Sequence, residues 1–227
     1  MEYIHNTEQF QFHNTVVALG KFDGMHKGHQ LIFDELIQYK QLGYQAAVFS
    51  FDRPPLNMLK HKHMRVIYTT NEKIKLLARR GIDIYIEHPF TDEFSHLSPE
   101  DFVIKVLLEK TGMKVLVVGD DCGFGYKRQG NVELLKRMSK EYDFKLIVIP
   151  KLELKGEIVS STRIRRLLSE GKVEEANRLM EDPFMICGPV VHGNHMGAEV
   201  LQMPTANQIP LENKLLPPNV VYVSRIH

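Results

Sequence analysis

Two histidines stand three residues apart in GKFDGMHKGHQ, residues 20–30. The apolar run 15–19 precedes this stretch and residues at helical spacing follow it, so it joins a predicted strand to a predicted helix. Its glycines allow a tight turn, and the helix start offers unpaired N–H groups and the positive end of a dipole. Because His26 and His29 share one helix face, both imidazoles can point at one anion. The stretch therefore predicts a phosphate site.

Two other interpretations of the histidine pair stay open. Together with Asp23 the histidines could bind a metal, although no clear third ligand accompanies the HxxH spacing. They could also be ordinary polar residues at a helix start. The stretch is not a Walker A loop, because no Gly-Lys-Ser/Thr follows, and it lacks the GxGxxG spacing.

Two further stretches carry groups suited to a nucleotide. VGDDCGFG, residues 118–125, follows another predicted strand, and glycines with a carboxylate suit a ribose or nucleotide contact, although such loops are also common turns. VSSTRIR, residues 159–165, opens a predicted helix, where its hydroxyls could be caps. The helix dipole disfavours arginines there, and a bound polyanion would resolve that conflict. Arg165 could clamp phosphates in a bidentate manner.

Strands and helices alternate to about residue 150, which predicts βαβ units and a parallel sheet covered on both faces. Ligands of such sheets bind beyond the carboxyl ends of the strands. We therefore expect the three stretches to converge at this edge. The predicted strands are 15–19, 44–51, 82–87, 115–118 and 146–149. One predicted helix ends before Gly43, a second is capped by Thr70 or Asn71 and runs to Arg80, and a third begins at Ser98. The others span 131–142 and about 161–169 and 172–180.

The composition limits the function classes. The chain has 227 residues, 43% of them hydrophobic, and its formal net charge of +1 gives no electrostatic case for a nucleic-acid partner. Cys122 and Cys187 fit neither a metal spacing nor a disulfide framework, which favours a reducing compartment. No signal-like apolar region opens the chain, and no apolar run approaches the roughly 20 residues that span a membrane. We expect a cytoplasmic protein without a membrane partner.

The residues after Pro183 predict the opening of a β-rich second domain, so the chain divides into 1–183 and 184–227. Residues 185–191 are strand-like, and an apolar run lies at 220–223. A unit this short rarely buries enough surface to fold alone, and its edge strands would expose unpaired backbone groups. We expect it to pack on the first domain or to self-associate.

Motifs along essentially the whole chain resemble the bacterial riboflavin kinase/FMN adenylyltransferase (FAD synthetase) family. GKFDGMHKGHQ is similar to its GxFDGxHxGHQ signature, VSSTRIR to its ISSTxIR signature, and VVGDDCGFG to its third nucleotide-site loop. LLSEGKVEEANRLMEDPF resembles the segment that joins its two domains, and GPVVHG and MPTAN resemble the start of its riboflavin kinase domain. The resemblance implies an α/β fold: a Rossmann-like nucleotidyltransferase domain with a parallel sheet, followed by a truncated β-barrel-type, riboflavin kinase-like segment.

The resemblance also implies a reaction, in which ATP transfers AMP to FMN to give FAD and pyrophosphate. Magnesium (Mg2+) would accompany ATP, and no protein residue is expected to bind a metal. His26, His29 and Arg165 would be catalytic through the phosphates. The ATP and phosphate contacts implied are Gly20, Phe22, Asp23, Gly24, Gly119, Asp121, Ser161 and Thr162.

The loop on the flavin side departs from the family pattern. The family's TFxPHP is SFDRPP here, so that Arg53 and Pro54 replace a proline and a histidine. This change motivates one rival function, an adenylyltransferase that acts on another phosphate such as nicotinamide mononucleotide or phosphopantetheine. The flavin-side residues implied by the resemblance are Phe51, Asp52, Arg53 and Pro55.

The kinase-like part departs further. Ala198 and Gln202 stand where the family has a basic residue and a glycine, whereas Thr205 and Asn207, at its magnesium and phosphate positions, are kept. The chain stops at His227, before the family's catalytic glutamate. We therefore predict an adenylyltransferase without riboflavin kinase activity. A second rival, a non-catalytic regulator that binds a flavin or nucleotide, is opposed by the intact histidines, serines and arginine of the motifs.

Overall fold

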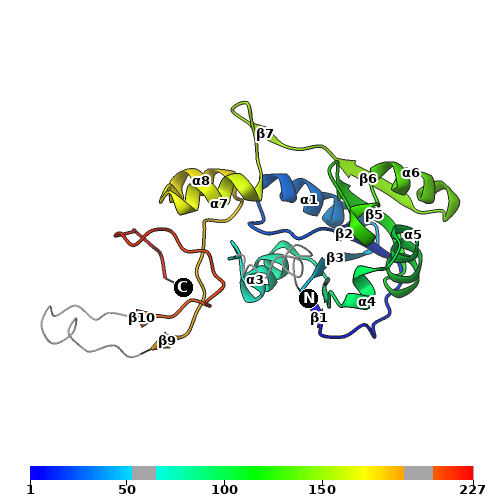
Figure 1. Ribbon diagram of the computed structural model, residues 1–227, viewed down its shortest axis with the longest axis horizontal. Coiled ribbons are helices and arrows are strands. Elements are labelled where there is room, and N and C mark those ends of the chain that lie inside the picture. The colour runs from blue at the N-terminus through cyan, green and yellow to red at the C-terminus, as the bar shows by residue number, and fades with distance from the viewer. Residues whose placement is uncertain (53–64, 192–206, 227) are drawn as a thin grey trace, which may run out of the picture.

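The computed structural model describes residues 1–52, 65–191 and 207–226 (Figure 1). A parallel sheet of six strands forms its centre, in the order β1-β4-β3-β2-β5-β6. Its inner strands are apolar throughout, as expected of strands covered on both faces. The strands are β1 (Glu2–His5), β2 (Thr15–Leu19), β3 (Gln45–Phe51), β4 (Ile84–His88), β5 (Met113–Gly119) and β6 (Lys145–Ile149).

Helices cover both faces of the sheet, and β2 shows the division. Val16 and Ala18 pack into one hydrophobic cluster, and Val17 and Leu19 pack into the other, because alternate residues of a strand point to opposite faces. The helices of the first cluster are α1 (Lys27–Gln41), α3 (Thr70–Arg80), α7 (Ser161–Ser169) and α8 (Val173–Leu179). The helices of the second cluster are α4 (Asp92–Ser95), η1 (Phe102–Lys110) and α6 (Val132–Glu141). The helix η1 is π-helical and continues α5 (Pro99–Asp101).

The strand order changes direction beside β2. The chain passes from β2 through α1 to β3 on one side, and later enters β5 on the other side of β2. The helices that follow β2 and β5, α1 and α6, therefore pack on opposite faces of the sheet. In this class of fold the usual ligand position is at the carboxyl edge, between the loops that leave two such strands. These are the loops that hold the first and second predicted stretches.

The predicted fold class is confirmed, and α7 has the predicted bounds. Strand β1 was not predicted; it is short and lies at the edge of the sheet, where it pairs with β4. The predicted cap of α3 at Thr70 or Asn71 is wrong. Thr69 caps the helix, because its side chain accepts from the Glu72 N–H while Glu72 accepts from the Thr69 N–H at 2.8 Å.

The C-terminal segment forms less regular structure than predicted. Of the predicted strand 185–191, only β9 (Val190–Val191) forms, and it pairs with β10 (Asn207–Gln208). The run 220–223 forms no strand: Val221 and Val223 are fully exposed, and no described strand lies beside them to pair their backbone. The remaining strands are β7 (Glu153–Leu154) and β8 (Glu157–Ile158), which make a small hairpin.

Candidate active site

The loop that leaves β2 has an unusual backbone. Phe22, Gly24 and Met25 have φ values of 48°, 82° and 37°, and left-handed values at residues other than glycine are costly and concentrate at functional sites. The buried Phe22 ring fixes the loop, since it packs edge-on against His29 with the ring centroids 5.2 Å apart. A Cβ atom at Gly20 would lie 2.8 Å from this ring, so the position requires glycine.

His26 is the N-cap of α1, a role that the sequence did not reveal. Its Nδ1 atom accepts the backbone N–H of His29 at 3.3 Å, and the two rings stack with centroids 3.6 Å apart. Because Nδ1 is an acceptor, a neutral His26 ring carries its proton on Nε2. The cap thus fixes both the orientation and the tautomer of the imidazole.

Both histidines are neutral at pH 7. Burial lowers the pKa of His26 to about 4, although Asp23 and Asp121 oppose the shift. Burial also lowers the pKa of His29 well below its usual value, and the charges of His26 and Lys73 add to the effect. The Nδ1 atom of His29 is buried with no hydrogen-bond partner among the described residues. A ligand oxygen would supply that partner.

Asp23 joins the first stretch to the third. Its Oδ1 atom accepts the backbone N–H groups of Ile67 and Tyr68 at 3.0 and 3.2 Å, and its Oδ2 atom pairs with Arg165. The backbone oxygen of Asp23 accepts a hydrogen bond from Ser161 Oγ. The carboxylate is therefore saturated by donors, and two motifs that are remote in sequence meet in one place.

Arg165 is held at two points, because its guanidinium also donates to the backbone oxygen of Arg65. The hydroxyls around it have different roles. Ser160 is the N-cap of α7 and accepts from the Arg163 N–H, whereas Thr162 is exposed. The cap of this helix is thus a third hydroxyl. Of the two predicted phosphate hydroxyls, Ser161 already donates to the backbone oxygen of Asp23, and Thr162 is exposed.

The loop after β5 lies near the histidine pair. Asp121 is close enough to His26 to act on its pKa, and it forms an ion pair with Lys151 at 3.1 Å. A Cβ atom at Gly119 would lie 3.4 Å from the Asp121 carboxylate, which is an ordinary van der Waals contact, so the space there does not require glycine. The second predicted stretch therefore lies near the first at the carboxyl edge of the sheet.

Three cations that sequence reasoning missed gather at the same edge. Burial and then the charge of Arg128 lower the pKa of Lys21, and Arg165 and Lys73 act in the same direction. Lys21, Lys73 and Arg128 form no ion pair with a carboxylate of the described residues. The signal in the sequence was weak: Lys73 lies in the first turn of α3, where a helix dipole disfavours a cation. This excess of positive charge suits a polyphosphate.

The predicted flavin-side residues are described only in part. The Phe51 ring packs among aromatic rings of the core, 5.5 Å from Phe90 and 5.6 Å from Phe94. Asp52 Oδ1 accepts the Phe90 N–H at 2.9 Å. Arg53, Pro55 and Thr205 lie outside the described residues, and Asn207 is an exposed residue of β10.

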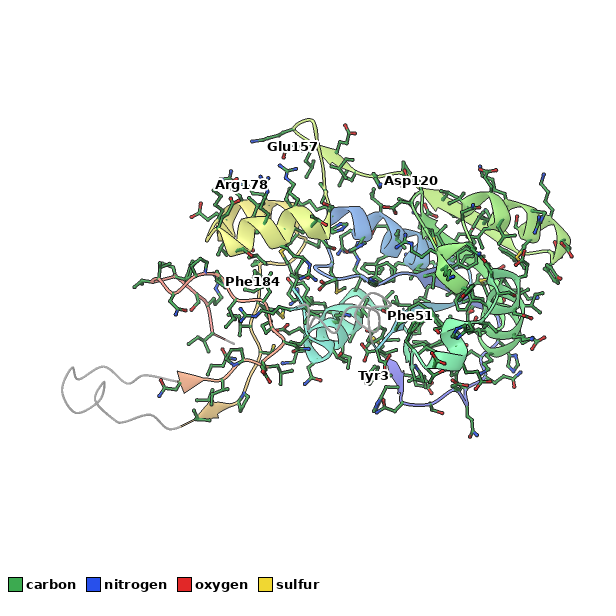
Figure 2. All side chains as sticks on the ribbon, in the orientation of Figure 1. Tyr3, Phe51, Asp120, Glu157, Arg178 and Phe184 are labelled. Carbon is green, nitrogen blue, oxygen red and sulfur yellow. The ribbon has the colours of Figure 1, made fainter. Side chains whose placement is uncertain are left out.

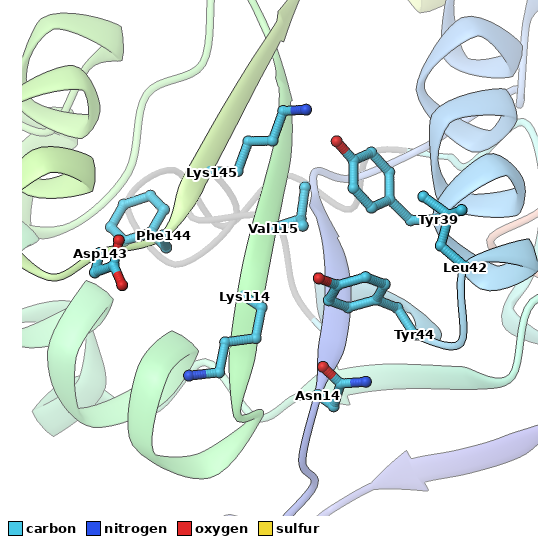
Figure 3. Close-up of a pocket in the computed structure, with 9 residues that line it drawn as sticks. All are labelled: Asn14, Tyr39, Leu42, Tyr44, Lys114, Val115, Asp143, Phe144 and Lys145. Carbon is cyan, nitrogen blue, oxygen red and sulfur yellow. The ribbon is translucent and has the colours of Figure 1, made fainter.

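A separate hollow of about 690 Å³ lies at the opposite, amino-terminal edge of the sheet (Figure 3). Tyr39 and Tyr44 point into it from the end of α1 and the start of β3, and Lys114 and Lys145 line it from β5 and β6. It holds none of the predicted site residues.

The parallel sheet, its switch point and a histidine pair beside clustered cations define the class of the protein, a Rossmann-like nucleotidyltransferase. More particularly, the chain belongs to the FAD synthetase family. The sequence model of FAD synthetase matches residues 8–163, and that of riboflavin kinase matches residues 180–227.

Relatives and a solved structure agree with this assignment. The chain is 39% identical to the bifunctional riboflavin kinase/FMN adenylyltransferase of Buchnera aphidicola from Schizaphis graminum, over 92% of this chain and 69% of the relative. It is 32% identical to the FAD synthetase of Listeria monocytogenes, over 83% and 77% of the two chains. A crystal structure from Streptococcus pneumoniae, described as a macrolide-efflux protein, has a TM-score of 0.82 at 30% identity and covers 95% of this chain and 70% of that one.

Two further expectations concern metals and membranes. Within residues 1–52, 65–191 and 207–226, no three or more histidine, cysteine, aspartate or glutamate side chains could together hold a metal ion. Cys122 and Cys187 are both free thiols. No helix in the described part of the chain is long and apolar enough to cross a membrane.

Proposed function

We propose that this chain transfers AMP from ATP to FMN, forming FAD and releasing pyrophosphate in the cytoplasm. The observation that carries the proposal is the Asp23 network, because it joins the histidine loop to the helix of Arg165 at the switch point. The names of the Buchnera and Listeria relatives support FMN as the acceptor.

The chemistry needs no covalent enzyme intermediate. An oxygen of the FMN phosphate attacks the α-phosphorus of ATP, the bond from this phosphorus to the bridging β-phosphate oxygen breaks in line, and pyrophosphate leaves with the bonding electron pair. The protein's part is to position the phosphates and to neutralise charge. The neutral imidazoles donate hydrogen bonds, and the guanidinium of Arg165 supplies positive charge beside them.

Magnesium is typical of the family, and it would arrive with the triphosphate. No group of three or more histidine, cysteine, aspartate or glutamate side chains among the described residues could hold it, and phosphate oxygens would supply ligands to it. When bound it supplies charge neutralisation at the phosphates. The cations of the carboxyl edge add to that neutralisation from the protein side.

The direct test incubates the purified chain with FMN, ATP and magnesium and measures FAD and pyrophosphate. Nicotinamide mononucleotide and phosphopantetheine are run in parallel as acceptors. FAD formation supports the proposal. Pyrophosphate release with another acceptor alone would support the first rival, and tight binding of FMN or ATP without turnover would support the regulator.

We also infer that the chain lacks riboflavin kinase activity. Two substitutions in the kinase-like segment support this inference: Ala198 stands where the family has a basic residue, and Gln202 where it has a glycine. Thr205 and Asn207 of the same segment match the family pattern. Riboflavin, ATP and magnesium should then give no FMN. Formation of FMN under these conditions would contradict the inference.

Self-association is a further proposal for the C-terminal segment. Val220, Val221, Val223 and Ile226 are exposed at 65%, 97%, 104% and 83%, which is unusual for so many apolar side chains in one short run. A second copy of the chain could cover them. Light scattering over a range of concentrations tests this, and a constant monomer mass would reject it.

A further inference from the structure

The C-terminal segment sends one charged side chain into the core of the first domain. Lys214 is fully buried, and its Nζ atom donates to Glu72 Oε2 at 2.7 Å and to the Ile67 oxygen at 2.6 Å. The ammonium also lies 4.9 Å from the ring centroid of Tyr68 and 4.5 Å from that of Phe184. Figure 2 shows Phe184 between α3 and the C-terminal segment. Two acceptors and two aromatic rings thus compensate the buried charge.

The backbone around Lys214 is attached to the same place. The Val66 N–H donates to the Asn213 oxygen at 2.7 Å, and the Leu215 N–H donates to the Val66 oxygen at 2.8 Å, which makes a short parallel bridge. Burial lowers the pKa of Lys214, while its hydrogen bond to Glu72 opposes that shift. Glu72 also accepts the Cys187 N–H at 2.7 Å, so a second part of the segment meets the same carboxylate.

The segment that Lys214 holds, residues 65–69, also carries backbone groups of the candidate active site. The Arg65 oxygen accepts from Arg165, and the N–H groups of Ile67 and Tyr68 donate to Asp23. The Ile67 peptide unit is therefore central: Asp23 binds its N–H, and Lys214 binds the carbonyl of the same residue. A shift of this segment would move Asp23, and Arg165 with it.

We propose that Lys214 is a positioning residue of the nucleotide site. Its ammonium fixes residues 65–69, these residues orient the Asp23 carboxylate, and the carboxylate orients Arg165 for phosphate binding. Part of the riboflavin kinase-like segment is then a component of the adenylyltransferase site. The effect on ATP binding rests on the proposed function. The effect on the position of residues 65–69 does not, because that position can be measured without ATP.

The decisive variant is Lys214→Met, which keeps most of the side-chain volume and removes the donors. Its matched control is Leu135→Ala, a truncation of a fully buried residue in the other hydrophobic cluster, remote from residues 65–69. Both changes should lower stability, so a loss of stability alone does not distinguish a positioning role from a packing role.

Two measurements make that distinction. Amide hydrogen exchange is compared at Ile67 and Tyr68, each normalised to the amides of β2 so that global opening cancels, and the Kd for MgATP is measured at a temperature where both variants are folded. For Lys214→Met we expect about tenfold faster normalised exchange and about a fivefold higher Kd, and no such change for Leu135→Ala. The proposal is overturned if the two variants behave alike in both measurements.

A second variant covers the case in which Lys214→Met does not fold. The double variant Glu72→Gln/Lys214→Met leaves no unpaired buried charge, yet still lacks a donor for the Ile67 oxygen. Glutamine has one acceptor oxygen for the Thr69 and Cys187 N–H groups, so Glu72→Gln alone is measured as the control. Relative to Glu72→Gln, we expect the double variant to show fast exchange at Ile67 and a raised Kd. Equal exchange and equal Kd in these two variants would contradict the proposal. If the unmodified chain binds no MgATP, the proposed function fails, while the exchange at Ile67 and Tyr68 still decides the role of Lys214.

Discussion

Arg165 donates to the carboxylate of Asp23, although 142 positions of sequence separate them. The same carboxylate accepts two backbone N–H groups, so its negative charge is compensated before any phosphate arrives. The pair therefore orients the guanidinium without presenting a bare anion to a polyanionic substrate. Lys21 and Arg128 add positive charge at this edge of the sheet.

Arg165→Lys should lower kcat/KM for FAD synthesis by about tenfold or more, because one ammonium cannot satisfy Asp23 and the Arg65 oxygen while it also binds phosphate. Steady-state kinetics with FMN and ATP measure this. Arg166→Lys, the same change at the adjacent exposed residue, is the control and should retain full activity. Equal rates for the two variants would contradict the clamp role.

Asp23→Asn should reduce kcat/KM by about tenfold, because an amide offers a single acceptor oxygen and turns an NH2 group toward either Arg165 or the two backbone donors. Thermal unfolding should show a parallel loss of stability. Asp34→Asn removes a carboxylate from an exposed pair with Arg80 and should change neither quantity much. Normal activity of Asp23→Asn would show that the network does not orient the site.

His29→Ala should lower kcat/KM by about 10² or more, since a donor to the phosphates in the transition state is lost. Circular dichroism must show that the variant is folded, because His29 stacks on His26 and packs against Phe22. The exposed His13→Ala provides the comparison. A folded His29→Ala protein with a normal rate would mean that the histidine pair only supports the loop.

Stability should fall as the pH drops from 7 to 5, because buried His26 resists protonation. Its pKa of about 4 lies below the value of about 6.5 in the unfolded chain, so the unfolded state binds more protons in this window. The contribution of neutral His26 to the free energy of unfolding is therefore complete above about pH 6.5 and is lost as the pH falls toward 4. For His26 alone the loss between pH 7 and 5 is about 2 kcal/mol.

Urea unfolding of the unmodified chain and of His26→Asn at several pH values measures this contribution. Asparagine keeps an acceptor for the His29 N–H, so the helix cap is preserved while the titrating ring is removed. The difference in unfolding free energy between the two proteins should shrink as the pH falls. A difference that stays constant would place the titration elsewhere.

Periodicity and motif spacing were sufficient for much of the fold and for the meeting of the three motif stretches at one edge of the sheet. Apolar strands alternating with helical patterns predicted a parallel sheet, and the carboxyl ends of parallel strands share one edge whatever the details of packing. For this reason the stretches at 20–30, 118–125 and 159–165 could be expected to converge before any contact was known. The helix predicted at about 161–169 forms over Ser161–Ser169, because its pattern is local.

Other features depended on contacts between remote residues, for which a sequence has no period. His26 is the N-cap of α1, which the sequence did not predict. The Asp23 carboxylate accepts hydrogen bonds from Ile67 and Arg165, whereas the sequence predicted a contact with phosphate. The short edge strand Glu2–His5 forms only because β4 is there to pair with it. Lys214 is the extreme case: nothing local distinguishes it from an exposed lysine, and only the tertiary structure brings Glu72, Ile67 and two aromatic rings around it. The sequence alone determined most helices and strands up to residue 180 and the edge at which their loops meet, because these follow from local patterns. The folded chain decided which edge strands form and which polar groups meet, because that depends on distance in space.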